Sequence, residues 1–237
     1  MRAEKAMISV RLSRQGRLAF ILLAGLATTA ASARDDLFWF NLAVNAEPWK
    51  NGALLHFDQE VEFDNSKLTD EETYMSVGYR LCPYASVYAG HRIVRDRYST
   101  VKLLTEHRPT IDVYLSAPEF WTIKLSHRSR FEYRDKKDCQ PYMRYRERFQ
   151  IGTSWSFSVL KFSPYANIEL FFSDKPGGHS SEAFDCTRSQ VGFSFLPAPS
   201  VPELSCTMYF MAFHYVSNGA RDWRPLNIYG LSLCYNF

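Results

Sequence analysis

After its first 27 residues the sequence contains no long apolar run. No later segment approaches the ~18 to 20 consecutive apolar residues that a membrane-spanning helix requires, and apolar stripes of helical length are few. Helices and closed β-barrels are the only structures that satisfy their backbone hydrogen bonds inside lipid. If this chain lies in a membrane, it must therefore cross it as a β-barrel.

The cysteines lack the spacing of a metal site. No Cys-x-x-Cys pair occurs and no histidine is close to a cysteine in sequence, so we expect no metal and no cofactor. Their number is odd, which in an oxidising compartment leaves at least one free thiol or an intermolecular bond. Cys206 and Cys234 are equidistant from position 220, the centre of the last predicted hairpin, so they could face each other as a disulfide or a packed pair. The five are Cys82, Cys139, Cys186, Cys206 and Cys234.

Without the N-terminal segment, the sequence also has no excess of basic over acidic residues. Residues 1–33 hold five of the 28 Lys and Arg residues but one of the 25 Asp and Glu residues. The rest of the chain therefore has 23 basic and 24 acidic residues, a formal net charge of −1. Because the basic isoelectric point belongs largely to the N-terminal segment, the composition does not support nucleic-acid binding.

That N-terminal segment has the three parts of a secretory signal peptide. Five basic residues precede the apolar run of residues 18–27, and small residues follow it, ending in Ala31, Ser32 and Ala33. This order predicts a signal peptide over residues 1–33 that is removed during export. The remainder, residues 34–237, has the length of one domain.

The mature chain consists of runs in which apolar and polar residues alternate, separated by polar or proline-containing breaks. Such runs predict β-strands, and the many aromatic residues and low mean hydropathy fit a barrel, in which half of each strand is polar. Residues 64–72 are predicted to form a polar loop. The eleven predicted runs are 37–46, 54–63, 73–81, 85–94, 106–117, 120–134, 142–155, 164–173, 185–195, 204–216 and 227–237.

Eleven runs conflict with the even strand number of single-chain bacterial barrels. Either residues 95–105 hide a twelfth strand, or one N-terminal run lies outside the closed barrel. We predict an all-β fold, a transmembrane antiparallel up-and-down β-barrel of about 12 strands, with 10 as the alternative. Long polar connections such as residues 173–181 alternate along the chain with tighter Pro-rich turns such as residues 197–202, which is typical of outer-membrane barrels.

The two central runs, 120–134 and 142–155, separate apolar from charged side chains at alternate positions. A charge that faces lipid near the midplane costs about 2 to 4 kcal/mol, so the charged positions should point into the lumen. Neighbouring runs add Asp58, Glu60, Glu62, Glu106, Arg108, Asp112 and Gln190. The candidate lumen and selectivity residues are Lys124, Arg128, Arg130, Glu132, Arg144, Arg146, Arg148, Glu169 and Arg188.

These charges allow two interpretations. They could form an ion-pair network that satisfies a polar core, or they could line a small pore with an Arg-rich constriction, as charged rings do in channels. Arginine exceeds acid in the central strands, which favours anion preference. Two residues break the alternation, because His127 and Glu147 fall on the apolar faces; Glu147 is expected near a membrane interface or at a shift in register.

The C-terminal run ends on an aromatic ring and places five apolar side chains on one face. It resembles the C-terminal signal by which Gram-negative cells recognise outer-membrane barrels for assembly. The resemblance implies the barrel-assembly machinery as a partner and outer-membrane lipid as the surroundings. The residues that carry this candidate assembly signal are Tyr229, Leu231, Leu233, Tyr235 and Phe237.

Four internal segments, residues 106–109, 128–134, 144–148 and 167–171, carry loose alternations of arginine and glutamate. In these the chain resembles the uncharacterised Gram-negative outer-membrane barrels grouped as domain of unknown function 2490. The resemblance extends over nearly the whole mature chain. It implies a barrel in the bacterial outer membrane, and it brings no activity, because none is assigned to the family.

A second resemblance is local. Residues 213–219 are similar to the His-x-Ser-Asn segment of outer-membrane lipid A deacylases and phospholipases, in which histidine activates serine against an acyl ester. Here His214 and Ser217, with Asn218 after them, are three apart, so a regular strand puts them on opposite faces unless a bulge intervenes. The better lipid face turns His214 inward; it consists of Tyr209, Met211, Phe213 and Tyr215.

A second His-x-Ser pair occurs earlier in the chain. His127 and Ser129 have the two-residue spacing and an outward parity, but no Asn or acidic partner is evident in the sequence. We therefore predict a non-enzymatic barrel that forms a narrow pore or a closed structural barrel. Acyl-ester hydrolysis by His214, Ser217 and Asn218, and capture of a ligand by the loops, remain the alternatives.

Overall fold

The computed structural model of the chain describes residues 37–48, 52–64, 67–96, 104–137, 139–157, 160–174, 184–197, 201–216 and 223–237. The predicted signal peptide, Ser217 and Asn218 lie outside these ranges. Within them, no helix is long and apolar enough to cross a membrane.

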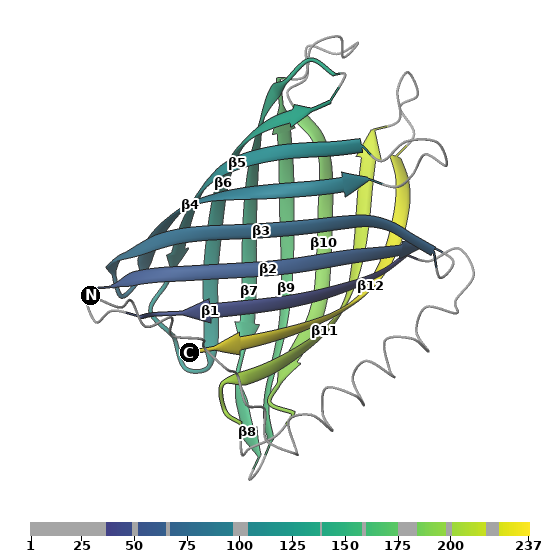
Figure 1. The fold of residues 1–237 in the computed structure, drawn as a ribbon. Helices are drawn as coiled ribbons and strands as arrows, with labels where there is room; N and C mark the ends of the chain where they lie inside the picture. The colour runs from purple at the N-terminus through teal and green to yellow at the C-terminus, as the bar shows by residue number, and fades with distance from the viewer. Residues whose placement is uncertain are drawn as a thin grey trace, which may run out of the picture.

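The described residues form twelve β-strands (Figure 1). They are β1 (Leu37–Ala46), β2 (Ala53–Asp64), β3 (Lys67–Cys82), β4 (Ala85–Asp96), β5 (Leu104–Ser116), β6 (Ile123–Lys136), β7 (Tyr142–Thr153), β8 (Trp155–Phe157), β9 (Leu160–Ser173), β10 (Phe184–Phe195), β11 (Leu204–Val216) and β12 (Trp223–Asn236). The predicted all-β barrel of about 12 strands is confirmed, and each of the eleven runs corresponds to one barrel strand.

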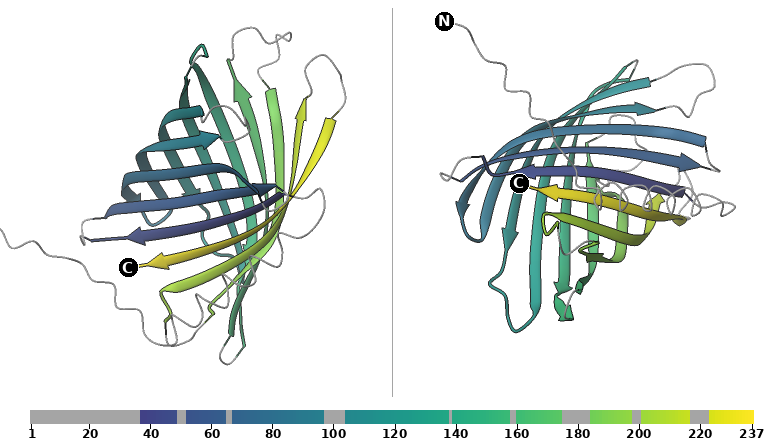
Figure 2. Two further views of the ribbon diagram at one scale, coloured as in Figure 1. Left: turned by 45° about the vertical axis from the view of Figure 1, so that its right-hand side comes forward. Right: turned by 60° about the horizontal axis from the view of Figure 1, so that its bottom comes forward.

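Eleven strands close the barrel, and β8 is a short addition at one end (Figures 1 and 2). Pairing runs in order from β1 to β7, passes to β9, continues to β12 and returns to β1. β8 pairs with the first residues of β9. The described strands therefore include every predicted N-terminal run in the closure, contrary to one of the two explanations offered for the odd number.

The barrel closes through a parallel pair. Residues 37–45 of β1 lie beside residues 228–236 of β12, and the two strands run in the same direction (Figure 1). A chain that reverses at every strand brings its first and last strands together antiparallel when their number is even and parallel when it is odd. The other explanation was a twelfth strand hidden in residues 95–105. Arg95 belongs to β4 and Thr105 to β5, and these two strands pair directly, so no further strand lies between them in the sheet; residues 97–103 lie outside the described ranges.

Two local predictions were wrong. β3 begins at Lys67, so Glu72, expected in a polar loop, lies within a strand; its polar neighbourhood reflects the barrel interior rather than a loop. Trp121, expected in a strand, lies in the turn before β6, with a φ of 58° and 85% of its surface exposed. Two backbone hydrogen bonds between Phe120 and Ile123, of 3.1 and 2.9 Å, close that turn.

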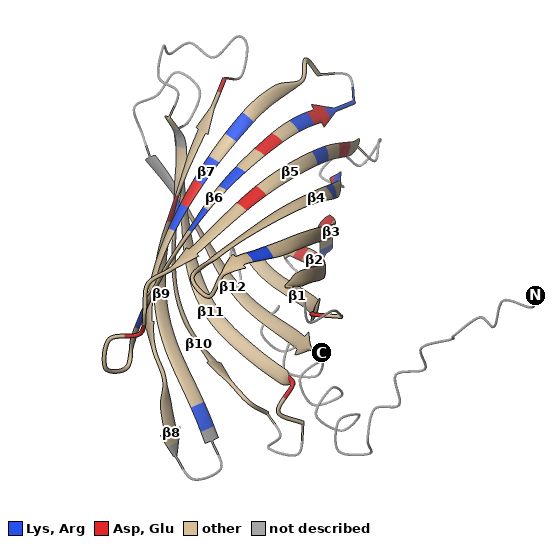
Figure 3. Ribbon diagram, turned by 90° about the vertical axis from the view of Figure 1, so that its left-hand side faces the viewer, with Lys and Arg blue, Asp and Glu red and all other residues tan. Residues whose placement is uncertain are grey.

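Alternation along the strands divides the barrel into two surfaces. In β6, Leu125 and Phe131 are exposed on the outside, whereas Arg128 and Arg130, at alternate positions between them, are buried. Figure 3 shows that charged residues gather along β5, β6 and β7, while β10, β11 and β12 are largely uncharged. The interior is therefore charged on one side of the barrel and more apolar on the other.

On the apolar side, Leu37, Met211 and Ile228 pack together between β1, β11 and β12. Phe213 shares their face, because the centre of its ring lies 5.9 Å from that of Phe171, a buried residue of β9 on the inner side of the sheet. The prediction that Tyr209, Met211 and Phe213 face outward was thus wrong, and His214 lies on the outward face instead. The sequence pattern of β11 does not show which of its faces points to lipid, because on this side of the barrel the interior also contains large hydrophobic side chains.

Cys206 and Cys234 do not pair with each other. Cys206 lies opposite Leu233, and Cys234 lies opposite Ser205. The register thus differs by one residue from the predicted one, and a one-residue shift turns a side chain to the other face of the sheet. The predicted facing of Cys206 and Cys234 was wrong for this reason.

Candidate functional site

The charged residues of β5, β6 and β7 lie directly opposite one another in the strand register. Asp112 is opposite Arg130, and Glu132 is opposite Arg144. Contacts also join strands that are not neighbours, such as Arg128 on β6 and Glu169 on β9. Only the concave side of a closed sheet brings such strands together, so these side chains lie in the barrel interior.

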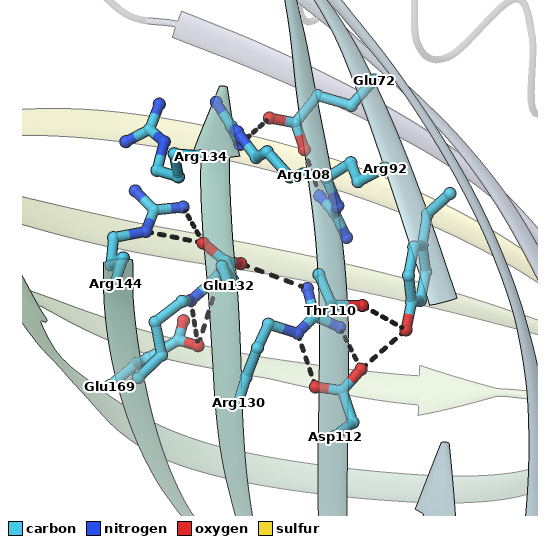
Figure 4. Close-up of polar contacts among 12 residues, drawn as sticks. Glu72, Arg92, Arg108, Thr110, Asp112, Arg130, Glu132, Arg134, Arg144 and Glu169 are labelled. Atoms are coloured by element: carbon cyan, nitrogen blue, oxygen red, sulfur yellow. Dashed lines mark hydrogen bonds and ion pairs between the residues drawn. The ribbon is translucent and has the colours of Figure 1, made fainter. Parts of the chain in front are cut away.

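Arg130 contacts Asp112 with two of its nitrogen atoms (Figure 4). Its Nε and Nη2 donate to Asp112 Oδ1 and Oδ2 at 2.5 and 2.9 Å, the bidentate geometry that makes arginine–carboxylate pairs strong. The Tyr74 hydroxyl donates to Asp112 Oδ2 at 2.7 Å, and the guanidinium groups of Arg92 and Arg130 lie over the Tyr74 ring at 5.1 and 5.0 Å from its centre. Asp112 has no exposed surface.

Glu132 continues the network toward β7. Arg144 Nε donates to Glu132 Oε2 at 2.6 Å, and Arg146 Nη1 donates to Oε1 at 2.8 Å. Arg146 also reaches Glu169, with Nη2 at 2.9 Å from Oε1. The ring of Phe171 lies beneath Arg144 and Arg146, at 5.4 and 4.7 Å from the two guanidinium carbons.

Glu169 is the point at which most cations meet. Arg128 Nη2 lies 2.6 Å from Oε1, Arg148 Nη2 lies 3.4 Å from Oε2, and Arg188 donates to Oε2 from Nε at 3.0 Å as well as from Nη2. With Arg146, four guanidinium groups surround a single carboxylate that has no exposed surface. This junction carries a local excess of positive charge.

A further cluster lies nearer the other end of the strands (Figure 4). Glu72 accepts from Arg92 Nη1 and, at 3.0 Å, from Arg108 Nη1. Arg108 Nη2 reaches Glu106 at 3.0 Å, and Arg134 contacts the same carboxylate, with Nη2 at 2.7 Å. The charged side of the interior is therefore occupied by paired side chains from β3 to β10.

The interior also contains a polar cavity of about 210 Å³ on the side that the network leaves open. Its lining comes from β1 and β2 on one wall and from β7 and β9 on another, so it lies inside the barrel. The charged groups at its surface are Glu60, Arg148 and Arg188, beside Trp39, Gln190 and Tyr209. Of the network arginines that touch Glu169, Arg148 is the most exposed, at 27% of its side chain.

Most of the candidate lumen residues lie in this network, and one does not. Lys124 is half exposed at the end of β6, where its Nζ lies 3.0 Å from Ser154 Oγ and 3.7 Å from Glu119. Glu72, Tyr74 and Arg92 were not among the predicted lumen residues. Glu72 falls in the predicted polar loop, whereas Arg92 lies in the predicted run 85–94, whose alternation is the signal that could have placed it inside.

An outward-facing cluster joins the two residues that break the alternation. Glu147 lies opposite Ser129 in an unshifted β6–β7 register, so the proposed shift in register at Glu147 is not observed. Ser129 Oγ donates to Glu147 at 3.0 Å from each carboxylate oxygen, and His127 Nε2 contacts Oε2 of the same carboxylate. The acidic partner that was not evident in sequence is thus supplied by the neighbouring strand.

The residues of the other His-Ser candidate are not brought together in the described chain. His214 lies on β11 opposite Thr187 and Pro225, whereas Ser217 and Asn218 lie outside the described residues. Among the C-terminal residues, Tyr229 is exposed on the outside, and Leu231 and Leu233 pack with Phe38 and Cys206. No group of three His, Cys, Asp or Glu residues suited to a metal ion occurs within the described ranges.

Comparisons with known proteins agree with this architecture. The sequence matches the family described as "Protein of unknown function (DUF2490)" over residues 37–211, from β1 into β11. No curated protein matches it. Among solved structures, the chain is similar to the NanC porin in a rhombohedral crystal form, with 12% sequence identity, 86% of this chain and 96% of that chain covered, and a TM-score of 0.51. At this identity the likeness concerns the fold.

Proposed function

The chain belongs to the family described as protein of unknown function (DUF2490), and from that premise we propose that it is an outer-membrane barrel acting as a narrow pore with a preference for small anions. Export through the periplasm by a cleaved signal peptide, and recognition of the C-terminal strand by the barrel-assembly machinery, are parts of the same proposal. The observation that carries it is the polar interior cavity bordered by Arg148 and Arg188.

The position of this cavity supports a path along one side of the lumen. The ion-pair network between β3 and β10 occupies the other side, where Asp112, Glu132 and Glu169 are fully buried. A volume of about 210 Å³ corresponds to roughly seven waters at their liquid volume of ~30 Å³ each, enough for a small hydrated ion. A solute of this size would pass next to Arg148 and Arg188.

The pairing of Arg148 supports its assignment as the selective cation. Its one contact with Glu169 is long, at 3.4 Å, and its buried Nε has no hydrogen-bond partner among the described residues. By contrast, Arg146 is bound closely by two carboxylates, at 2.8 Å from Glu132 and 2.9 Å from Glu169, and Arg130 donates twice to Asp112, at 2.5 and 2.9 Å. A guanidinium with unused donors can interact with a passing anion, as charged groups do in selective pores.

Conductance in a planar bilayer tests the proposal. The refolded mature protein, residues 34–237, should give small discrete current steps with anion preference. Arg148→Ala and Arg188→Ala should each lower the ratio of anion to cation permeability, because each removes positive charge at the cavity. Lys124→Ala serves as the matched control and should leave the ratio unchanged, since Lys124 lies outside the network and is half exposed. A folded but silent barrel would instead make these arginines structural.

A further inference from the structure

We propose that the outward face of β6 and β7 carries a catalytic site that cleaves acyl esters of membrane lipids, with Ser129 as the nucleophile and Glu147 as its proton acceptor. This activity is independent of conduction through the lumen. It rests on the geometry of three side chains that the ion-pair network inside the barrel does not use, and on the apolar groove beside them.

The three side chains are brought together by the pairing of β6 with β7. His127 and Ser129 are two residues apart on β6 and therefore share the outward face, and Glu147 lies opposite Ser129. The serine hydroxyl donates to the carboxylate of Glu147 at 3.0 Å, and the ring of His127 contacts that carboxylate from the other side. A serine within hydrogen-bond reach of a base, which a third group orients, is the arrangement of an activated nucleophile.

The surroundings of the cluster are apolar in every direction along the sheet. Leu125 and Phe131 flank it on β6, and Tyr145 and Phe149 flank it on β7; the ring of Phe149 lies 4.6 Å from that of His127. The next strands place Val113 and Leu170 beside it. Ionisable groups at such positions in a membrane protein are costly and typically functional, and apolar side chains here would satisfy the alternation equally well.

A shallow apolar groove adjoins the cluster on the same outward face. His127 forms part of its wall, and the remaining lining is largely hydrophobic; its volume is about 670 Å³, within the ~300 to 1,000 Å³ of small-molecule sites. The apolar lining suits a hydrocarbon chain lying along the barrel surface. Besides His127, the large outward-pointing side chains of the groove are Leu115, Leu125, Phe149, Ile151 and Ile168.

The reaction that fits this arrangement is ester hydrolysis in two steps. Ser129 Oγ forms a bond to the ester carbonyl carbon while its proton passes to Glu147. The bond from that carbon to the lipid oxygen then breaks, and the lipid alcohol leaves with the proton held by Glu147. Water attacks the acylated Ser129, giving its proton to Glu147, and the fatty acid departs as Ser129 recovers a proton. The sum is one ester and one water converted to one acid and one alcohol.

His127 acts as a positioning residue in this scheme. Its Nε2 contacts the Oε2 atom of Glu147, and its ring packs against Phe149, so it holds the carboxylate toward Ser129. A hydrogen-bond donor of similar reach should replace it. His127→Gln is therefore expected to retain much of the activity, whereas His127→Phe, which keeps the ring but removes the donor, is expected to lose it.

Labelling with a long-chain alkyl fluorophosphonate tests the site directly. The purified full-length barrel in detergent should acquire the label on the peptide that contains Ser129, and the same protein in vesicles of phosphatidylethanolamine and phosphatidylglycerol should release fatty acid. Ser129→Ala should abolish both signals. Glu147→Gln keeps the shape of the side chain and should lower both by at least about 100-fold, the usual contribution of a general base.

Ser189→Ala provides the matched control. Ser189 is an exposed serine on the outward face of β10, opposite Ile168 and Ala212, and its replacement should leave labelling and release unchanged. Heat-dependent mobility on gels verifies that each variant is folded. Absence of label on folded wild-type protein, or fatty-acid release that persists in both Ser129→Ala and Glu147→Gln, would overturn the proposal.

Discussion

At the scale of single residues, the barrel interior depends on a few carboxylates shared by several arginines. Glu169 is contacted by four guanidinium groups and has no exposed surface. Carboxylate and guanidinium groups removed from water must be paired, because removing one partner of a buried ion pair typically costs about 3 to 5 kcal/mol. Loss of Glu169 would leave four buried cations in mutual repulsion.

Glu169→Gln should therefore destabilise the barrel by about 3 kcal/mol or more, measured as the free energy of unfolding by guanidinium chloride in detergent micelles. Glu119→Gln is the matched control, because Glu119 is half exposed and lies 3.7 Å from Lys124. An exposed pair of this kind contributes about 0 to 1 kcal/mol. Equal unfolding midpoints for the two variants would contradict the role given to Glu169.

At the scale of strands, the parallel pairing of β1 with β12 is the feature that distinguishes this barrel. Side chains support the backbone pairing, since Asn45 Nδ2 donates to Asn236 Oδ1 and Ser232 Oγ donates to Asn41 Oδ1, both at 2.9 Å. The backbone N–H of Phe237 extends the seam by donating to Asn45 O at 2.8 Å. The seam thus has a definite register along its whole length.

A designed disulfide tests this register. Ala43 lies directly opposite Cys234, so the thiol introduced by Ala43→Cys should form a disulfide with Cys234 on mild oxidation, detected by mass spectrometry of the non-reduced peptides. Adjacent strands bring opposite residues within the ~4.4 to 6.8 Å between Cα atoms that a disulfide needs. Val44→Cys is the control, because it lies opposite Tyr235 and faces the other side of the sheet. Failure of Ala43→Cys to cross-link would argue against a parallel seam in this register.

At the scale of the whole molecule, the outward faces form an apolar surface interrupted by few ionisable groups, and the interior is polar. This is the inverse of a water-soluble protein and is typical of a barrel in lipid. Exposed residues of this surface include Met75, Val77, Ile111, Leu125 and Val191. This distribution of side chains over the described residues supports the proposed location in the bacterial outer membrane.

Cell fractionation tests that location. Expressed with residues 1–33 in a Gram-negative host, the protein should be recovered in the outer-membrane fraction with the mass of residues 34–237, because the proposed signal peptide would be removed on export. Recovery of the unprocessed chain in another fraction would contradict both expectations.

The same fractionation, applied to a variant that lacks Phe237, tests the candidate assembly signal. The shortened chain should still be processed at Arg34, but less of it should reach the outer membrane, because the terminal aromatic residue is lost. An internal control is Phe210→Leu, which changes an aromatic residue of the neighbouring strand and keeps the C-terminus intact. Equal recovery of the shortened and intact chains would exclude Phe237 from the assembly signal.

The sequence by itself determined the strands and the division of their two faces. Alternation is a local property, so β1 and β11 were predicted with the boundaries observed, and the charged positions of β6 and β7 were separated from the apolar ones before any contact was known. The same local signal failed where the interior is apolar, because alternation alone does not say which face of β11 points inward.

Only the tertiary structure decided which strands and side chains meet. The parallel seam follows from bringing together two strands almost 200 residues apart in the chain, and no local pattern encodes that choice. Glu147 looked anomalous in its own strand, and its meaning depended on the register that sets it against Ser129 and His127. Pairing between strands is a long-range interaction, so most residues of the interior network and all three of the outward cluster could be identified one by one, but not as partners.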